Sequence, residues 1–420
     1  FKVLLDACAS GGEDTKSAAA FALGGVCVGN MPAGLPVLQS KLEEGGSAYL
    51  LLSALREVLS HHGTMGASGT LDVTPYVGTV LPILEAHCAD EDEGARNMTA
   101  ECLGSIAVVK PNKIVPWLAE MAGGENKTNT RWTVITSVKY AVTSPKTASA
   151  LGAEITKLMA GLKDEDLGVR RAALLSLNAV VHHRVALVRH LLIDTSSSEG
   201  KDGGDADMGG AGGSGSDDLE RTGIFPLLYN EMRPKPELVR EVDLGPFKHK
   251  MDDGLPLRKA AFACMDSILE RARERVGGAD FMPHVIEGLS DVDDVKMLCH
   301  QLVSKMCQWP VWQRHVTNHL DGIVSGLDEA FKKLDATGRG AVKAEASSDF
   351  IRSALRALDA ISRVPDALSV RSFAALLERM EKRDETAVLL EAIRAERTGS
   401  SSHASAVPMG GAGGGAHDYK

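Results

Sequence analysis

Apolar residues recur every three to four positions along most of the chain, and this period predicts amphipathic helices. A phrase repeats within them: an acidic turn, a small or apolar residue, Lys or Arg, and an Ala-rich apolar run. Its clearest copy is KDEDLGVRRAALLSL at 163–177. Successive copies lie about 40 residues apart, or at longer intervals where a degenerate copy or an insertion intervenes. Their basic residues are Lys16, Arg96, Arg131, Arg170, Arg258, Lys296 and Arg352.

A unit of this length with Asp before its second helix is typical of HEAT repeats. The acidic turn residues can cap the second helix, and the basic residue can reach the acidic turn of an adjoining repeat. Each helix pair leaves an apolar stripe that only stacking can bury. We therefore predict an all-α fold, a HEAT-repeat superhelical solenoid with one protruding β-hairpin.

Segments of low apolar content interrupt this pattern. Residues 195–218 are rich in Gly, Ser and Asp, and such a composition cannot offset its ordering entropy. We expect HEAT repeats over 1–194, a disordered acidic insertion at 195–218, C-terminal HEAT repeats over 219–396 and a disordered tail at 397–420. Residues 333–348 are expected to form a second, irregular insertion between helices.

The predicted hairpin covers about 237–253, where the helical period gives way to a period of two. In ELVREVDL (237–244), apolar residues Leu238, Val242 and Leu244 all occupy even-numbered positions, as side chains on one face of a strand do. In FKHKMD (247–252), bulky residues alternate with charged ones. Gly245-Pro246 separates the two runs and predicts a turn. A hairpin that joins no larger sheet leaves the backbone groups at its edges unpaired, which indicates that the hairpin has a function of its own.

Composition narrows the possible partners. The formal net charge of −10 argues against a surface that follows nucleic-acid phosphates, and no apolar run approaches the length of a membrane span. The seven cysteines lie mostly among apolar residues without a C-x-x-C pair, so we expect buried thiols in a reducing compartment. The chain starts at Phe1 in the middle of a pattern, and we expect it to be a piece of a longer protein.

Two motifs imitate chemical sites. The loop that starts at Asp335 resembles a calcium-binding EF-hand loop, but Arg339 and Ala346 stand where oxygen ligands belong. His315 and His319 have a spacing that could hold zinc on a helix, yet no third ligand is indicated. We expect no metal, no cofactor and no catalytic residues; the sequence favours a binding surface over an active site.

The residues also carry a family resemblance. The stretch ELVREVDLGPFKHKMDDGLPLRKAAFACM (237–265), with KSAAAFALG (16–24), VGNMP (28–32) and RNMTAECLG (96–104), closely resembles the C-terminal part of the cullin-associated and neddylation-dissociated proteins. The resemblance runs in one order to about residue 390. It departs at 195–218, which looks like an addition, and at 333–348, where a charged family segment is replaced.

This resemblance implies a non-enzymatic exchange factor for SCF-type cullin–RING ubiquitin ligases, located in the cytoplasm and nucleus. It implies binding to the N-terminal domain of an unneddylated cullin, in competition with a Skp-type adaptor and its F-box receptor. In the family the RING subunit is contacted mainly by N-terminal repeats, which this chain lacks. The alternative is another HEAT-repeat scaffold or a karyopherin-like carrier, which would leave the hairpin unexplained.

The hairpin is where the resemblance places the partner contacts. We expect Leu238 and Met251, near its base, to anchor it to its own repeat. The residues expected to contact the cullin or its adaptor site are Arg240, Glu241, Val242, Leu244, Phe247, Lys248, His249 and Lys250.

Overall fold

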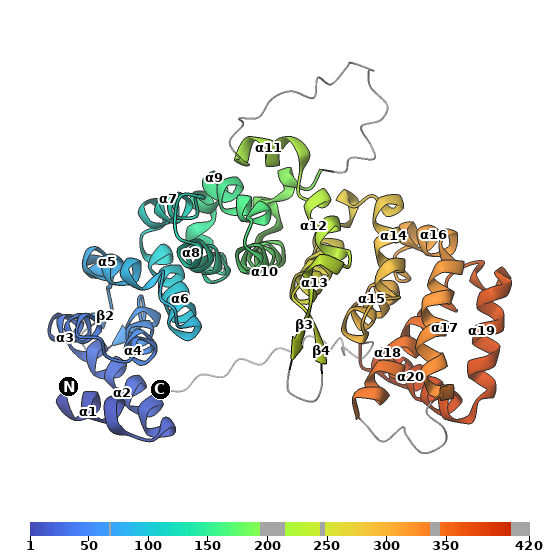
Figure 1. Ribbon diagram of the computed structural model, residues 1–420, viewed down its shortest axis with the longest axis horizontal. Helices are drawn as coiled ribbons and strands as arrows, with labels where there is room; N and C mark the ends of the chain where they lie inside the picture. The colour runs from blue at the N-terminus through green and yellow to red at the C-terminus, as the bar shows by residue number, and fades with distance from the viewer. Residues whose placement is uncertain (67–68, 194–214, 244–247, 337–344, 405–420) are drawn as a thin grey trace, which may run out of the picture. The chain divides into compact units, whose positions relative to one another are not determined.

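Figure 1 shows the computed structural model of the chain, which describes residues 1–66, 69–193, 215–243, 248–336 and 345–404. These residues form α-helices joined by short turns, and two pairs of short strands. The chain divides into two compact units, Phe1–Gly277 (unit 1) and Gly278–Lys420 (unit 2). Within the described ranges no helix combines the length and hydropathy that crossing a membrane requires.

Unit 1 holds the longer series of helices. Its helices are α1 (Lys2–Ser10), α2 (Glu13–Gly29), α3 (Met31–Glu43), α4 (Ala48–Ser60), α5 (Val77–His87), α6 (Glu93–Val109), α7 (Pro111–Met121), α8 (Thr128–Ala141), α9 (Ala148–Met159), α10 (Leu167–Arg184), α11 (Gly215–Thr222), α12 (Phe225–Met232) and α13 (Leu255–Ala272). Its strands pair as β1 (Met65–Gly66) with β2 (Gly69–Thr70), and β3 (Val239–Asp243) with β4 (Lys248–Asp252).

Unit 2 consists of helices in its described part. They are α14 (Gly278–Gly288), α15 (Asp293–Met306), α16 (Pro310–Asn318), α17 (Leu320–Ala336), α18 (Glu345–Ile361), α19 (Arg371–Lys382) and α20 (Asp384–Ala404). Helix α18 packs against both α15 and α20, and α17 packs against α19.

Stacked helix pairs build unit 1. Helices α2, α4, α6, α8, α10 and α13 each pack against the next in the series, and helices such as α3, α5 and α7 cover them from outside. Between α6 and α8, Leu103, Ile106, Val134 and Val138 are fully buried. Burial of such stripes between neighbours supplies the apolar contact that no pair could make alone. The predicted HEAT-type helical fold is confirmed.

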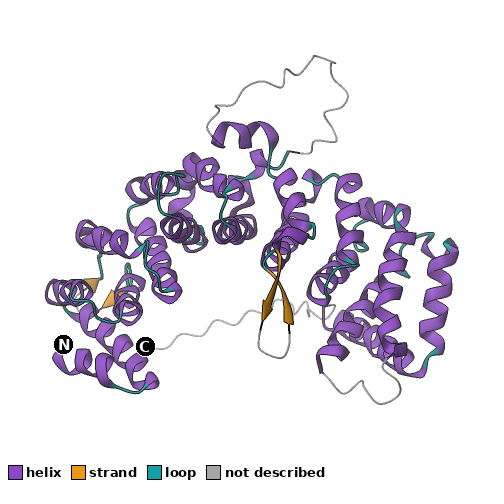
Figure 2. Ribbon diagram, viewed as in Figure 1, coloured by secondary structure: helices purple, strands orange, loops and turns teal. Residues whose placement is uncertain are grey.

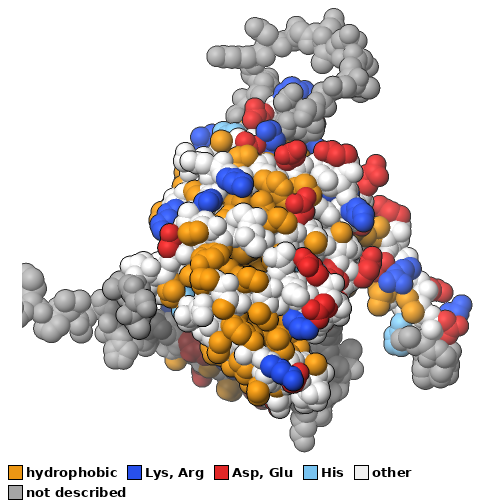
Figure 3. Space-filling model, turned by 90° about the vertical axis from the view of Figure 1, so that its left-hand side faces the viewer, with side chains coloured by type: hydrophobic (Ala, Val, Ile, Leu, Met, Phe, Trp, Pro, Cys, Tyr) orange, Lys and Arg blue, Asp and Glu red, His pale blue; other side chains and the backbone are white. Residues whose placement is uncertain are grey.

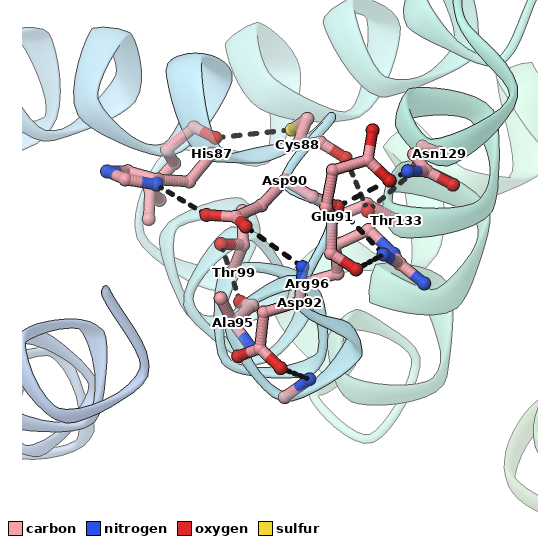
Figure 4. Close-up of polar contacts among 12 residues, drawn as sticks. His87, Cys88, Asp90, Glu91, Asp92, Ala95, Arg96, Thr99, Asn129 and Thr133 are labelled. Carbon is pink, nitrogen blue, oxygen red and sulfur yellow. Dashed lines mark hydrogen bonds and ion pairs between the residues drawn. The ribbon is translucent and has the colours of Figure 1, made fainter. Parts of the chain in front are cut away.

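The acidic turns cap the second helix of two repeats. Asp92 accepts hydrogen bonds from the N–H groups of Gly94 (3.3 Å) and Ala95 (2.8 Å) at the start of α6 (Figure 4). Asp166 accepts one from Val169 N–H (2.9 Å) in α10. This confirms the expected capping in these copies. Asp293 is instead the first residue of α15, where Val292 holds the N-cap position, and Asp349 lies inside α18, so neither caps its helix in this way.

The basic residues of two neighbouring copies of the phrase, Arg96 and Arg131, bind different sets of acceptors. Arg96 donates to the carbonyls of its own turn, Asp90 O (2.7 Å) and Glu91 O (2.9 Å), as Figure 4 shows. Arg131 also donates to a carbonyl of its own turn, Asn126 O (2.6 Å), and in addition reaches the following turn, where it holds Asp164 through two hydrogen bonds of 2.8 and 2.9 Å. Burial raises the pKa of Asp164, but the Arg131 guanidinium, the Asp166 N–H and the charge of Arg170 together hold the pKa below its ordinary value.

A similar arginine–carboxylate contact joins the helices before and after the insertion at 195–218. Arg170 donates to the carbonyls of Asp164 and Glu165, and its Nε lies 3.1 Å from the carboxylate of Glu231 in α12. Lys235 also contacts Glu231, at 2.9 Å, and this carboxylate is almost fully buried. Repeats separated in sequence by 195–218 are therefore joined as directly as neighbouring ones.

Several boundaries differ from those expected. Helix α17 continues to Ala336 and α18 starts at Glu345, so both ends of the segment 333–348 are helical; residues 337–344 lie outside the described residues. Helix α20 runs to Ala404, past 397, and α11 begins at Gly215, inside the predicted insertion. An established helix adds further residues at low cost, so it can extend beyond the point where propensity falls. The short β1–β2 pairing was not predicted.

One end of unit 1 carries apolar side chains on its surface. Figure 3 shows hydrophobic side chains gathered over this face of the molecule. Exposed large hydrophobic residues from α1, α2 and α4 include Val3 (80% exposed) and Phe21 (61%), with Val26 and Tyr49 less exposed. In an array where each helix pair is covered by its neighbour, an end pair leaves one apolar face open.

Adjacent glycines in α2 give a stability test of the stacking. A Cβ on Gly24 would lie 2.6 Å from Glu57 Cβ and 2.8 Å from Ala54 O of α4, whereas one on Gly25 would meet nothing within 4 Å. Gly24→Ala should lower the free energy of unfolding by about 1–3 kcal/mol through overpacking. Gly25→Ala should raise it by about 0.5–1 kcal/mol because alanine favours helix. Urea unfolding followed by circular dichroism checks this, and effects of the same sign would contradict the packing.

Candidate functional site

The hairpin formed by β3 and β4 grows from the turn between the two helices of one repeat. It leaves α12 through a short turn at Pro236–Leu238 and returns directly to α13 (Figure 2). The strands are antiparallel and pair Val239 with Asp252 through to Asp243 with Lys248. The predicted strands are confirmed, whereas Gly245-Pro246, with Leu244 and Phe247, lies outside the described residues.

The register gives the hairpin two different faces. Glu241 lies opposite Lys250 and Asp243 opposite Lys248, and we call these four residues the charged face. The other face pairs Arg240 with Met251 and Val242 with His249, and we call it the apolar-basic face. Side chains directly opposite each other in an antiparallel pair share a face, so the period of two in the sequence becomes this division.

The hairpin is unburied on both faces. Met251 is 47% exposed and Val239 41%, and only Val242 and Asp252 among the strand residues are half-buried. The expectation that Met251 packs onto its own repeat is therefore wrong; Leu238, at the base, is half-buried. A two-stranded hairpin is at best marginally stable alone, so attachment at its base has to hold it.

An ion pair between a half-buried aspartate and a buried arginine makes this attachment. Asp252, the last residue of β4, lies 2.8 Å from the guanidinium of Arg258, whose side chain is only 2% exposed in α13. The second oxygen of Asp252 accepts the N–H of Gly254 (2.9 Å). Burial raises the pKa of Asp252, but the hydrogen bond and charge of Arg258, together with the backbone N–H groups of Gly254 and Leu255, hold the pKa below its ordinary value.

A second contact closes the base from outside. Arg240 donates to Asp253 through Nε (2.7 Å) and a terminal nitrogen (3.3 Å), and the same nitrogen lies 3.0 Å from the sulfur of Met251. Asp253 N–H also donates to the carbonyl of Leu238 at 3.1 Å. These contacts join β3 to the turn after β4, so the hairpin leaves the repeat in a defined direction.

The structure places six of the eight predicted residues. Arg240, Glu241, Val242, Lys248, His249 and Lys250 lie together on the strands, and all but Val242 are exposed. Sequence reasoning did not identify Asp252 and Arg258 as the anchor. A signal for it was present, because Arg258 is the basic residue of a HEAT phrase and Asp252 belongs to the acidic turn before it.

His315 and His319, which have the spacing of a zinc site, make contacts within their own helix and its end. Nδ1 of His319 donates to the carbonyl of His315 (2.9 Å), and the His315 ring packs on Trp312. No group of three or more metal-ligating side chains occurs among the residues that the structure describes. The seven cysteines are free and buried, as expected, and burial raises the pKa of Cys88 to about 12.

Comparison with known proteins gives the family. Residues 219–381 match TIP120, described as TATA-binding protein interacting (TIP20). The cullin-associated NEDD8-dissociated protein 2 of Rattus norvegicus is 35% identical over 414 residues, which cover 95% of this chain and 29% of the relative. Protein 1 of Dictyostelium discoideum is 33% identical over 400 residues, 93% of this chain and 29% of the relative. The chain thus spans less than a third of these relatives.

A protein described as the C-terminal part of cullin-associated NEDD8-dissociated protein 1, from Emericella nidulans, is 28% identical over 316 residues, 74% of this chain and 27% of the relative. Among solved structures, yeast importin-beta covers 93% of this chain and 45% of its own, with a TM-score of 0.60 and 10% identity. A second importin-beta structure has a TM-score of 0.58 at 13% identity and the same coverage. These two likenesses show the HEAT-type fold alone. The chain belongs to the cullin-associated NEDD8-dissociated protein family and corresponds to its C-terminal part.

Proposed function

We propose that this chain is a non-enzymatic cullin-binding regulator and that its hairpin carries the partner contact. The names of its relatives describe association with cullins. The observation that carries the proposal is an exposed hairpin held at its base by an ion pair to a buried arginine. An exposed hairpin adds little buried surface to its own repeat, whereas it can insert into the surface of a partner protein.

The finer proposal is exchange of substrate receptors on SCF-type ligases. The chain would bind the N-terminal domain of an unneddylated cullin and compete with the Skp-type adaptor and F-box receptor. Where two ligands overlap on one protein, each weakens the other by the same factor. A short-lived ternary complex then lets either ligand leave, so exchange speeds up without nucleotide hydrolysis.

Replacing residues 244–248 by a short Gly/Ser linker tests the proposal. The variant should keep its helical circular dichroism, because the replaced residues lie beyond the anchor at Asp252, yet lose the ability to displace adaptor from a purified, unmodified cullin. Glu125→Ser with Lys127→Ser is the matched control, since both are exposed in the turn between α7 and α8. Undiminished displacement by the linker variant would exclude the hairpin as the element that displaces adaptor.

The alternative, a karyopherin-like carrier, has weaker support. The importin-beta structures share the helical architecture at 10–13% identity, which says nothing about cargo. A carrier would also leave the anchored hairpin without a role. Binding to a basic import signal, unaffected by the linker replacement, would favour the carrier over the cullin regulator.

A further inference from the structure

The two faces of the hairpin differ in how far they satisfy their own charges. On the charged face each carboxylate lies opposite a lysine, and Lys248 Nζ also lies 3.7 Å from the carboxylate of Glu241 across the diagonal. Opposite charges paired across strands stabilise a hairpin by a few tenths of a kcal/mol to about 1 kcal/mol. This face therefore stabilises the strands and needs no partner to neutralise it.

The apolar-basic face differs because it has no pairs of opposite charges across the strands. It exposes Met251 and part of Val242, and none of its four residues carries a carboxylate. Arg240 is held from the side by Asp253, which directs one guanidinium nitrogen onto the Met251 sulfur. The second terminal nitrogen of Arg240 is not used in these contacts, and His249 is exposed beside Val242.

The open backbone edges of the two strands are less suited than the apolar-basic face to binding a partner. Each strand has five residues, and Glu241, Asp243, Lys248 and Lys250 place charge along both. Short strands bearing charged residues are a common means of preventing edge-to-edge pairing. Addition of a partner strand is thus disfavoured, and so is pairing with the hairpin of a second copy.

From these contacts we propose that the hairpin docks through its apolar-basic face and leaves the charged face toward solvent. Its occupant is an apolar patch of the cullin that carries a carboxylate within reach of Arg240 and His249. Charge complementarity selects this occupant, because the face offers the Arg240 guanidinium, a histidine ring and apolar surface but carries no carboxylate of its own. The inference rests on the proposed function and adds the side of the hairpin on which recognition occurs.

Paired double variants test the assignment by titration of the whole chain against a purified, unmodified cullin. Val242→Ala with Met251→Ala removes apolar surface from one face and should weaken binding at least about tenfold, the effect of losing central contacts. Val239→Ala with Asp243→Asn alters the other face at two residues outside the predicted contacts and should change binding less than about threefold. Circular dichroism and the unfolding midpoint show whether each variant keeps its fold.

The outcomes separate this inference from the function on which it rests. If the charged-face variant binds more weakly and the apolar-basic variant does not, the faces are assigned wrongly. Equal losses, or no loss in either while the 244–248 linker variant fails to bind, also overturn the inference but leave the cullin function intact. If the unmodified chain does not bind the cullin, both fail. Self-association in sedimentation that only the apolar-basic variant abolishes would assign the face to a second copy instead.

Discussion

Asp252→Ala should lower the free energy of unfolding of unit 1 by about 1.5–3 kcal/mol, because the buried guanidinium of Arg258 loses a charge-assisted hydrogen bond. The guanidinium of Arg258 is 2% exposed and lies 2.8 Å from the Asp252 carboxylate, which also holds the Gly254 N–H. Urea unfolding followed by circular dichroism measures the loss. Asp243→Ala is the matched control, because it removes an exposed carboxylate near the end of the same hairpin and should cost less than about 1 kcal/mol, the upper value of one cross-strand charge pair.

A double variant separates stability from orientation. Asp252→Ala with Arg258→Met removes both charges and should recover most of the lost stability, since an apolar side chain of similar length suits a buried position. The hairpin would still lack its anchor, so under the proposed function its displacement of adaptor should remain impaired. A double variant as unstable as Asp252→Ala alone would show that the ion pair is not the source of the effect.

The pH dependence of this contact has a defined sign. The pKa of Asp252 lies below its unfolded value, which is about 3.9 for an aspartate. Its stabilisation is therefore fully present above that value and is lost as the pH falls through the lower folded pKa. Hairpin anchoring should accordingly be constant at neutral pH and weaken only in strong acid.

Acidification between pH 6.5 and 4 should destabilise unit 2 through His300. Burial, reinforced by the charge of Lys296, lowers the pKa of His300 to about 4 from an ordinary 6.5, while Asp293 opposes the shift. The unfolded chain therefore binds a proton in this window that the folded chain rejects, and stability falls as the pH falls. The gap between the two values corresponds to about 3 kcal/mol.

The contacts of His300 explain why protonation is costly. Its Nδ1 lies 2.8 Å from Ser353 Oγ, and Ser353 donates its hydroxyl proton to the carbonyl of Phe350, so Nδ1 is the protonated nitrogen. Nε2 is buried and has no hydrogen-bond partner among the described residues. A second proton would therefore be placed in a desolvated position.

The measurement compares unfolding of the unmodified chain and His300→Gln at pH 7 and pH 4.5. Glutamine can keep the hydrogen bond to Ser353 without titrating in this range. The difference in stability between the two proteins should shift in favour of the variant as the pH falls. Parallel pH profiles would show that His300 does not resist protonation. Carboxylates that titrate near pH 4.5 affect both proteins and cancel in the comparison.

Local patterns predicted the elements whose causes are local. A period of three to four gave the helices, and the acid before α6 and α10 gave the caps at Asp92 and Asp166, because a cap joins residues two or three apart. The period of two gave β3 and β4. The extents of α17, α18 and α20 were misjudged, since helix ends depend on propagation from residues outside the low-propensity stretch.

What the sequence determined by itself was the repeated helical fold, the place of the hairpin and, through its long matching stretches, the family. Only the tertiary structure decided which side chains meet across repeats: Arg131 with Asp164, Arg170 with Glu231, and Arg258 with the end of β4. It also showed that Met251 faces solvent rather than its own repeat. The physical reason is that periodicity fixes which way a side chain points along its own element, whereas its partner depends on how separate elements pack.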